Sequence, residues 1–303
     1  MNSITSVTHP IEYVTMDGVE IRLINSGDGT EVIHHRIEKG ARWAMQPAEG
    51  VTALESVYVL EGELGLSTST ESRTLTPHQS FAAHPVEEAC VFLAHEDSEF
   101  LYITSQPVFQ YYSDEVQKKV KLAIEVAEKD GYTADHCKRI MKICMMMGEH
   151  QELSPDDMCT LNFASFLHDI GKIHIPEEVL QKPGKLTEEE WALMKKHPTF
   201  GREMLETVPS PHLKRAASIV EQHHERFDGK GYPNGLDGSR LSPLSSIVSV
   251  ADAYDAMTTD RPYRKAMSPE AALQEIQKHK GTMFHPDVVK DFIALFPEIC
   301  KIN

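Results

Sequence analysis

Histidine and aspartate residues recur through the second half of the chain in short, separate groups. In chain order the groups are His136, His168-Asp169, His197, His223-His224 and Asp252. Imidazole nitrogen and carboxylate oxygen are the ligand atoms that borderline divalent metals accept. A single histidine would carry little weight, but this repeated pairing of types predicts a metal site assembled from distant segments.

His168 and Asp169 are expected to be buried, and burying a charged group costs free energy. They follow the apolar stretch Leu161 to Leu167, which reads as the end of a buried helix. Burying an unpaired carboxylate costs several kcal/mol, unless a cation or a hydrogen-bond donor compensates it. A metal ion beside Asp169 would remove that cost.

The length and the net charge of the chain limit its domain organisation and its partners. A chain of 303 residues favours two domains over one. The net charge of −16 predicts an acidic surface that repels nucleic-acid polymers and anionic membranes. The sequence has no apolar run long enough to cross a bilayer, and its start lacks the pattern of an export signal. We therefore expect a cytoplasmic protein.

The first part of the chain, residues 1–108, has the pattern of strands and turns. Apolar residues alternate with others over residues 57–66 around Gly62, and the segment 100–103 reads as a buried strand. These patterns predict an antiparallel β-barrel or sandwich.

After Tyr112 the apolar residues recur at steps of three and four, which predicts helices. Helix starts are marked by a serine or threonine followed by proline or acidic residues, at Ser154-Pro155, Thr187 to Glu190 and Ser268-Pro269. We expect a connecting helix over residues 109–130 and an all-α domain over residues 131–303.

From about Val120 to the C-terminus, the sequence resembles the HD-GYP domain. This is a subgroup of the HD phosphohydrolases that degrades the bacterial second messenger cyclic di-GMP. The resemblance rests on ordered motifs at residues 168–172 (HDIGK), 197–201 (HPTFG), 223–233 (HHERFDGKGYP), 252–258 (DAYDAMT) and 261–264 (RPYR).

The resemblance implies a metal-dependent phosphodiesterase. In this family pattern one metal would be held by His136, His168, Asp169 and Asp252, and Asp169 would bridge to a second metal held by His197, His223 and His224. Two such cations activate water and neutralise charge on the phosphate. His168 and Asp169 thereby belong to the catalytic group, which Lys172 would complete as a cation beside a phosphate oxygen. We expect iron, with manganese as the next choice and zinc left open.

The resemblance also implies contacts with a cyclic dinucleotide. Arg261 and Arg264 suit phosphate or guanine. Asp255, one helical turn after Asp252, is expected to lie on the substrate side or to support the metal ligands, with a plain position on the helix surface as the alternative. Some members carry a glutamate four residues before the first ligand histidine, where it helps to hold a third metal. Tyr132 occupies that position here, so we expect two metals and 5′-pGpG as the product.

The sequence also fits two other functions. One is a protein that binds a cyclic dinucleotide without hydrolysing it and signals through a partner. The other is a hydrolase of another nucleotide, such as 3′3′-cGAMP. The turn-rich segment Gly231-Tyr232-Pro233 is expected beside the ligand histidines, where it could recognise a protein partner.

The N-terminal part weakly resembles cupin barrels at residues 59–64 and 75–84. The paired histidines of metal-binding cupins are absent, so we expect no catalytic metal there. A regulatory domain that binds a small ligand is our hypothesis, and a homodimerisation module is the alternative.

Overall fold

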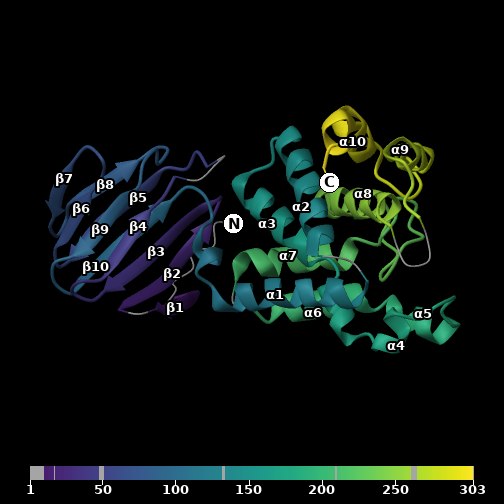
Figure 1. Cartoon of the computed structure of the whole chain (residues 1–303), viewed down its shortest axis with the longest axis horizontal. Helices are drawn as coiled ribbons and strands as arrows, with labels where there is room; N and C mark the ends of the chain where they lie inside the picture. The colour runs from purple at the N-terminus through teal and green to yellow at the C-terminus, as the bar shows by residue number, and fades with distance from the viewer. Residues whose placement is uncertain are drawn as a thin grey trace. The chain divides into compact units, whose positions relative to one another are not determined.

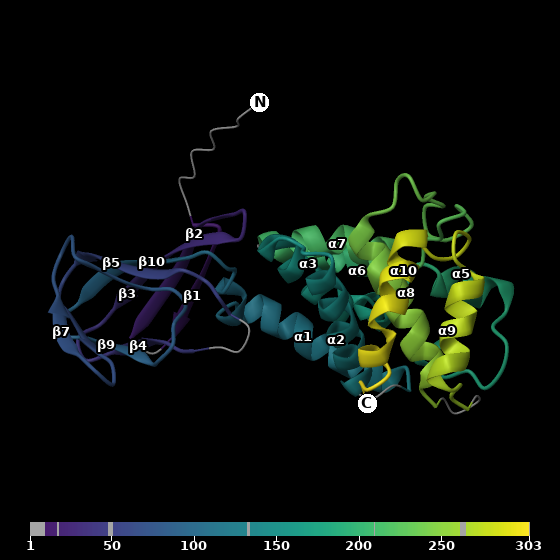
Figure 2. The ribbon, with the colours of Figure 1, turned by 90° about the horizontal axis from the view of Figure 1, so that it is seen from above.

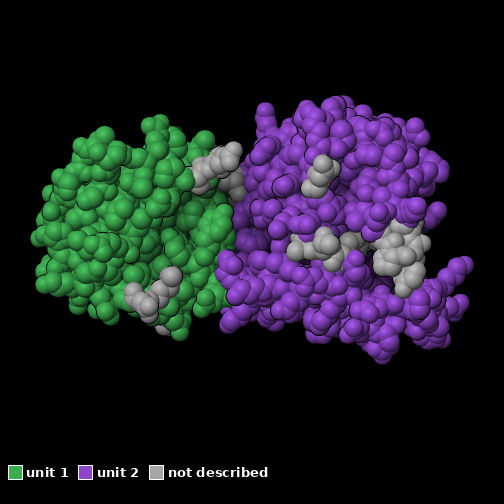
Figure 3. Space-filling model, in the orientation of Figure 1, with its two compact units in different colours: residues 1–114 green, residues 115–303 purple. Residues whose placement is uncertain are grey.

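The chain folds into two compact units, residues 1–114 and residues 115–303 (Figure 3). The computed structural model describes residues 10–16, 18–47, 51–131, 134–208, 210–260 and 265–302. Each unit has its own cluster of buried apolar side chains. The first unit is built of strands and the second of helices, which confirms the predicted two-domain fold class.

The first unit consists of two antiparallel sheets (Figures 1 and 2). The larger sheet has the strand order β1-β2-β3-β10-β5-β8, and the smaller has the order β4-β9-β6-β7. The strands are β1 (Glu12–Met16), β2 (Val19–Gly27), β3 (Thr30–Ile37), β4 (Arg42–Met45), β5 (Glu55–Glu61), β6 (Leu64–Ser67), β7 (Ser72–Leu75), β8 (Ser80–Ala83), β9 (Cys90–Ala94) and β10 (Ser98–Thr104).

Strands β5 and β10 show why this pattern of residues forms a sheet. They pair so that Phe100 lies opposite Val59 and Tyr102 opposite Val57, and along both strands these positions alternate with less buried ones. Gly62 turns the chain after β5 with a φ of +81°, and a Cβ there would lie 2.3 Å from Ser98 Oγ. Only glycine fits this turn.

The second unit contains the remaining elements. They are α1 (Asp114–Lys129), α2 (Ala134–His150), α3 (Pro155–Leu167), the 3₁₀-helix η2 (Ile170–His174), α4 (Glu177–Leu180), α5 (Glu188–Met194), α6 (His197–Glu206), α7 (Pro211–Gln222), α8 (Pro243–Thr258), α9 (Pro269–Lys278) and α10 (Pro286–Ile299). The predicted caps are confirmed, because Ser154, Thr187 and Ser268 each accept a hydrogen bond from a backbone N–H of the first turn of their helix. No described helix is both long and apolar enough to span a bilayer.

The expected connecting helix begins later than residue 109. Residues Phe109–Tyr111 form a short 3₁₀-helix, η1, and α1 starts at Asp114. Phe109 is buried in the apolar cluster of the first unit, and the backbone N–H groups of Val108 and Phe109 both donate to Glu31 Oε2. These contacts hold residues 108–109 in the β unit, so the helix cannot start there.

Helix packing in the second unit brings the ligand-bearing segments together. Helix α2 packs on α3 and α8, α3 packs on α7, and α6 packs on α7 and η2. The approach of η2 to α6 depends on Gly171, where a Cβ would lie 2.0 Å from the carbonyl oxygen of His197. Any larger residue would force apart the segments that carry Asp169 and His197.

Candidate metal centre

The predicted ligands lie at the ends and inner faces of five helices. His136 is in the first turn of α2, and Asp252 is on α8. His168 and His223 cap the C-terminal ends of α3 and α7, while His197 is the first residue of α6. Segments separated by many residues therefore present imidazole and carboxylate groups to one region.

Three of the histidines are oriented by the same kind of hydrogen bond to a backbone carbonyl. Nδ1 of His168, His197 and His223 lies 2.9, 2.8 and 2.6 Å from the carbonyl oxygen three residues earlier in the chain, which belongs to Ser165, Met194 and Val220 respectively. A carbonyl only accepts, so in each ring Nδ1 carries the hydrogen and Nε2 keeps a lone pair. This fixes the tautomer in which Nε2 can bind a metal.

The ligand atoms fall into two groups that share Asp169. Ligand atoms of Asp169, His197, His223 and His224 lie within 4.8 Å of one another, and so do those of His136, His168 and Asp169. Asp169 Oδ1 is 3.1 Å from His197 Nε2, and Asp169 Oδ2 is 3.3 Å from His168 Nε2. The two oxygens of one carboxylate thus face the two groups separately, as a bridging ligand requires.

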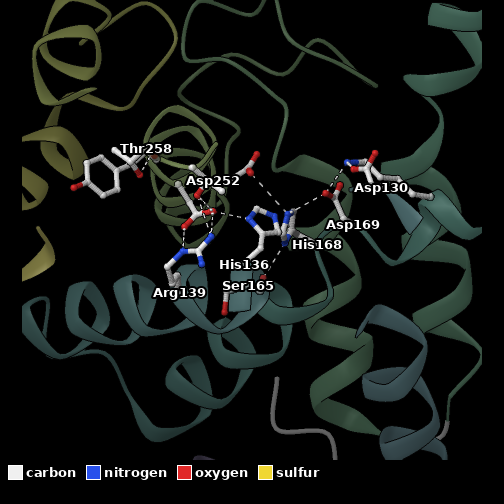
Figure 4. A network of polar contacts seen from close by, with 12 residues as sticks. Asp130, His136, Arg139, Ser165, His168, Asp169, Asp252 and Thr258 are labelled. Atoms are coloured by element: carbon white, nitrogen blue, oxygen red, sulfur yellow. Dashed lines mark hydrogen bonds and ion pairs between the residues drawn. The ribbon is translucent and has the colours of Figure 1, made fainter. Parts of the chain in front are cut away.

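Asp252 extends the group around His168. Its Oδ1 lies 3.9 Å from His168 Nε2, and Figure 4 shows both side chains directed toward the same region as His136 and Asp169. All the predicted metal ligands are therefore brought to one place.

The buried polar atoms fit a cation. His168 Nε2 and Asp169 Oδ1 are buried and have no hydrogen-bond partner within the described part of the chain. Leaving such groups unpaired costs about 1–3 kcal/mol each, and more for a charged group. His197 Nε2 and His223 Nε2, both lone-pair atoms in the tautomers above, lie only 3.4 Å apart. A metal ion held by these atoms would satisfy them, and the mixed nitrogen and oxygen donors suit a borderline divalent metal.

The pKa values of the ligands also favour a bound cation. Burial lowers the pKa of His223 and of His224 well below the ordinary value, so both rings are neutral. Burial would by itself raise the pKa of Asp169, but Lys172 and His168 hold it well below its usual range. Burial would lower the pKa of His168, but the carboxylates of Asp169 and Asp252 raise it to about 9. The field that favours a proton on His168 would equally favour a metal cation there.

Lys172 lies beside the bridging carboxylate. Its Nζ donates to Asp169 Oδ2 at 2.7 Å and to Asp130 Oδ2 at 2.6 Å, and the lysine side chain is 13% exposed. Burial would lower the pKa of Lys172, but the two carboxylates raise it well above the ordinary value. Lys172 is therefore a fixed positive charge next to the two ligand groups.

Asp255 supports a ligand histidine. It is buried, and its Oδ2 lies 2.7 Å from His136 Nδ1. Arg139 engages both oxygens of the same carboxylate. Burial would raise the pKa of Asp255, but His136 and Arg139 lower it. With both oxygens engaged inside the protein, the geometry does not favour the substrate contact expected for Asp255, and favours the other expected role, support of the metal ligands.

The segment Gly231-Tyr232-Pro233 lies beside the ligand histidines, as the sequence predicts. Tyr232 packs on His224 with ring centroids 4.8 Å apart. The loop is held by Glu225, a buried carboxylate that accepts the backbone N–H groups of Asn234 and Leu236 at 2.6 and 3.1 Å. A Cβ on Gly231 would lie 2.5 Å from Glu225 Cα, so this glycine is required by a close backbone approach.

Three residues singled out in the sequence, Arg261, Arg264 and Tyr132, lie outside the described residues. Asp130, Arg139 and Glu225 contact residues of the site and are not among the residues predicted from the sequence. Arg139 follows His136 by three residues and so shares its helix face, and Glu225 directly follows the histidine pair. Those two placements are signals that could have found them, whereas Asp130 carries none.

Curated relatives match the region that contains the site. A cyclic di-GMP phosphodiesterase of Thermotoga maritima is 38% identical over 66% of this chain and 54% of its own length. The response regulator RpfG of Xanthomonas campestris, named a cyclic di-GMP phosphodiesterase, is 38% identical over 59% of this chain and 48% of its own. A 3′3′-cGAMP-specific phosphodiesterase of Vibrio cholerae is 34% identical over 60% and 35%. The chain thus spans about half the length, or less, of these relatives.

Solved structures also match about a third of the chain. An RmlC-like cupin from Shewanella frigidimarina covers 36% of it at 15% identity, with a TM-score of 0.31. KdgF from a Halomonas species covers 33% at 18% identity, with a TM-score of 0.30.

The family comparison covers most of the helical unit and both ligand groups. The profile described as the HD domain matches residues 112–288. This is more than half of the chain and includes every predicted ligand from His136 to Asp252, so the chain belongs to the HD-domain family.

Proposed function

We propose that this chain is a metal-dependent phosphodiesterase that hydrolyses cyclic di-GMP to 5′-pGpG. The observation that carries the proposal is the pair of ligand groups that share Asp169. The proposal is further supported by relatives named cyclic di-GMP phosphodiesterases at 38% identity. When bound, two divalent metals would supply an activated water and neutralise charge on the phosphate. Iron is the first expectation for these metals and manganese the second.

The charge of the site explains why a dinucleotide would bind only to the metal-loaded protein. Among the described residues at the site, four carboxylates face two cationic side chains and the ring of His168, whose pKa is raised to about 9, so the carboxylates outnumber the cations and an anionic phosphate would be repelled. Two divalent cations reverse that sign. The groups in question are Asp130, Asp169, Asp252 and Asp255 with Lys172 and Arg139.

Lys172 is the side chain proposed to act on substrate. Its ammonium group is held between Asp130 and Asp169 beside the bridging ligand. From that position it would face a phosphate oxygen and stabilise the negative charge that grows on it during attack. His168 and Asp169 would act by holding the metals in place.

Arg261 and Arg264 are proposed to bind the dinucleotide. Guanidinium groups pair with phosphate through two hydrogen bonds or stack on a base, and both modes suit this substrate. We also propose that Tyr132, in place of a glutamate, restricts the site to two metals and stops the reaction at 5′-pGpG.

The decisive experiment is product analysis on anaerobically prepared protein. Wild-type protein loaded with iron or manganese is incubated with cyclic di-GMP, and the products are separated by chromatography. We expect 5′-pGpG without accumulation of GMP. Binding of cyclic di-GMP with no product under either metal would refute the hydrolase and support a non-catalytic sensor.

A second substrate has its own support. Relatives of this chain named 3′3′-cGAMP-specific phosphodiesterases are 34–35% identical to it. The same metal chemistry would serve both dinucleotides, because they share the scissile phosphodiester and differ in a base. A competition assay with both substrates in one reaction separates the two, and a higher kcat/KM for 3′3′-cGAMP would change the assignment.

The remaining parts of the chain are proposed to regulate this activity. The β unit would bind a small ligand or form a homodimer, and the loop at Gly231-Tyr232-Pro233 would contact a protein partner. We also propose that the enzyme is cytoplasmic and binds neither a membrane nor a nucleic-acid polymer. A thermal-shift screen of the full-length protein tests the first of these roles, since no response to any small molecule would favour dimerisation.

A further inference from the structure

Arg139 and Asp255 form a buried ion pair behind one of the ligand histidines. Arg139 lies on α2 one helical turn after His136, and Asp255 lies on α8 one turn after Asp252. Figure 4 shows Arg139 and His136 side by side, both directed toward α8. The side chain of Asp255 is 3% exposed and that of Arg139 is 17% exposed. The pair is therefore largely shielded from water.

Both oxygens of Asp255 and two of the guanidinium nitrogens of Arg139 have defined partners. Arg139 Nε donates to Asp255 Oδ1 at 2.5 Å, and Arg139 Nη2 donates to Asp255 Oδ2 at 3.0 Å. Nη2 also donates to Thr259 Oγ1 at 3.0 Å, which ties the guanidinium to the end of α8. Asp255 Oδ2 is left 2.7 Å from His136 Nδ1. Arg139 therefore fixes the rotation of the carboxylate that faces the histidine.

The ligand histidines differ in what orients them. His168, His197 and His223 are oriented by backbone carbonyls, which cannot move without their helix. His136 is oriented by the flexible side chain of Asp255. An aspartate can rotate about two side-chain bonds, so it orients a ring reliably only when its own oxygens are held. In this site Arg139 contacts both oxygens, and Thr259 Oγ1 adds a longer hydrogen bond to Asp255 Oδ2 at 3.3 Å.

We propose that Arg139 is a positioning residue for the metal site: by holding both oxygens of Asp255, it keeps His136 Nε2 directed at the metal shared with His168 and Asp169. This inference rests on the proposed metal centre. Arg139 touches neither metal nor substrate in this scheme. Its effect should fall on the ligand group that contains His136 and leave the group of His197, His223 and His224 largely unchanged.

The test is metal binding by the full-length protein without substrate. Wild-type and Arg139→Met proteins are stripped of metal, and Mn²⁺ binding is followed by equilibrium dialysis and electron paramagnetic resonance. Loss of a partner that orients a ligand typically costs about 10- to 100-fold in metal affinity. We expect a loss of that size for one of the two Mn²⁺ ions in Arg139→Met, and a much smaller change for the other.

Two further variants make the result specific. Arg139→Lys keeps a cation beside Asp255 but cannot hold both oxygens in the planar fork, so its loss should be smaller than that of Arg139→Met yet measurable. Arg202→Met is the matched control, because Arg202 also pairs with two carboxylate oxygens, those of Glu206 and Glu221, on a helix that carries a ligand. It should bind both ions as the wild type does.

The outcomes separate this inference from the proposed function. Wild-type affinity for both ions in Arg139→Met and Arg139→Lys would overturn the positioning role alone. If Arg139→Met does not fold, as judged by circular dichroism, Arg139→Lys decides the question. Equal weakening of both ions in either arginine variant would also overturn it, because a general loss of structure would then be the cause. A wild type that takes up no Mn²⁺ would overturn the metal centre itself.

Discussion

At the scale of single residues, Asp169 is the side chain on which the two ligand groups depend. Its oxygens face His197 on one side and His168 on the other, and its charge also holds Lys172. Every other predicted ligand belongs to one group only. Removing Asp169 therefore affects both groups, whereas removing His168 affects one.

This difference gives a prediction about metal content. We expect Asp169→Ala to lose most of both metals and His168→Ala to lose mainly one, and both variants to lose turnover. Each variant removes a direct ligand, and Asp169 is shared. Elemental analysis of the purified proteins measures the first effect and a hydrolysis assay the second. Full metal content in both variants would contradict the ligand assignment.

Lys172 and Asp130 give a second prediction, about activity without loss of metal. Lys172→Ala removes the positive charge beside the phosphate, so it should retain both metals and lower kcat by about 10²-fold or more. Asp130→Asn keeps the size of the side chain but removes the charge that holds Lys172. It should cause a smaller loss of kcat, also with both metals retained. Loss of metal from Lys172→Ala would indicate that the lysine instead stabilises Asp169 as a ligand.

The sequence predicts the ligands better than their supports. Histidine and aspartate are uncommon enough in apolar helices that their types and order indicate a metal site. Asp130 and Arg139 are ordinary charged residues, and although Arg139 shares a helix face with His136, the partner that each of them holds is set by packing. Lys172 and Asp130 are 42 residues apart, and Arg139 and Asp255 are 116 residues apart. No local pattern relates such pairs.

At the scale of elements, helix ends account for the precision of the site. At the end of a helix the ring can bond back to a carbonyl three residues earlier, as His168 and His223 do. Apolar periodicity predicts that such helices exist, and capping residues such as Ser154 and Thr187 predict where they start. It does not predict the start of α1, because Phe109 belongs to the core of the β unit.

Strand β3 carries a buried ionisable group of a different kind. His35 is fully buried, and its ring stacks on Phe100 with centroids 4.7 Å apart. Trp43, Tyr102 and Tyr112 surround it, and neither of its ring nitrogens has a hydrogen-bond partner among the described residues. Burial lowers the pKa of His35 from 6.5 to about 3. The folded β unit therefore holds this ring neutral.

The lowered pKa predicts acid sensitivity of the β unit. Below pH 6.5 the unfolded chain takes up a proton at His35 that the folded chain refuses until about pH 3. Stability is thus lost as the pH falls through this window, by about 1.4 kcal/mol per pH unit. In His35→Phe, the loss of unfolding free energy between pH 7 and pH 5 should be smaller by about 2 kcal/mol than in the wild type.

Denaturant unfolding followed by Trp43 fluorescence measures this effect. Both proteins should carry Trp191→Phe, so that the signal reports the β unit alone. His34→Phe is the matched control, because His34 lies on the same strand but is partly exposed and pairs with Glu99. An unchanged pH dependence in His35→Phe would show that His35 does not titrate in this way.

At the scale of the whole molecule, the two units have separate apolar cores. The cluster of the β unit and that of the helical unit share no residue. All the predicted metal ligands belong to the helical unit, between His136 and Asp252. A ligand that binds only the folded form of one unit stabilises that unit by mass action. Metal should therefore stabilise the two units unequally.

Calorimetry of the full-length protein tests this division. We expect two unfolding transitions in the metal-free protein, the helical one followed by circular dichroism and the other by Trp43 fluorescence in a Trp191→Phe background. Free Mn²⁺ at 100 times its dissociation constant stabilises a folded unit by about 2.7 kcal/mol per site. For a unit of this size, that shifts the midpoint upward by about 5–10 °C for each ion. The helical transition should move and the β transition should not, because the β unit holds none of the ligands. Equal shifts of both transitions would mean that the cores unfold together.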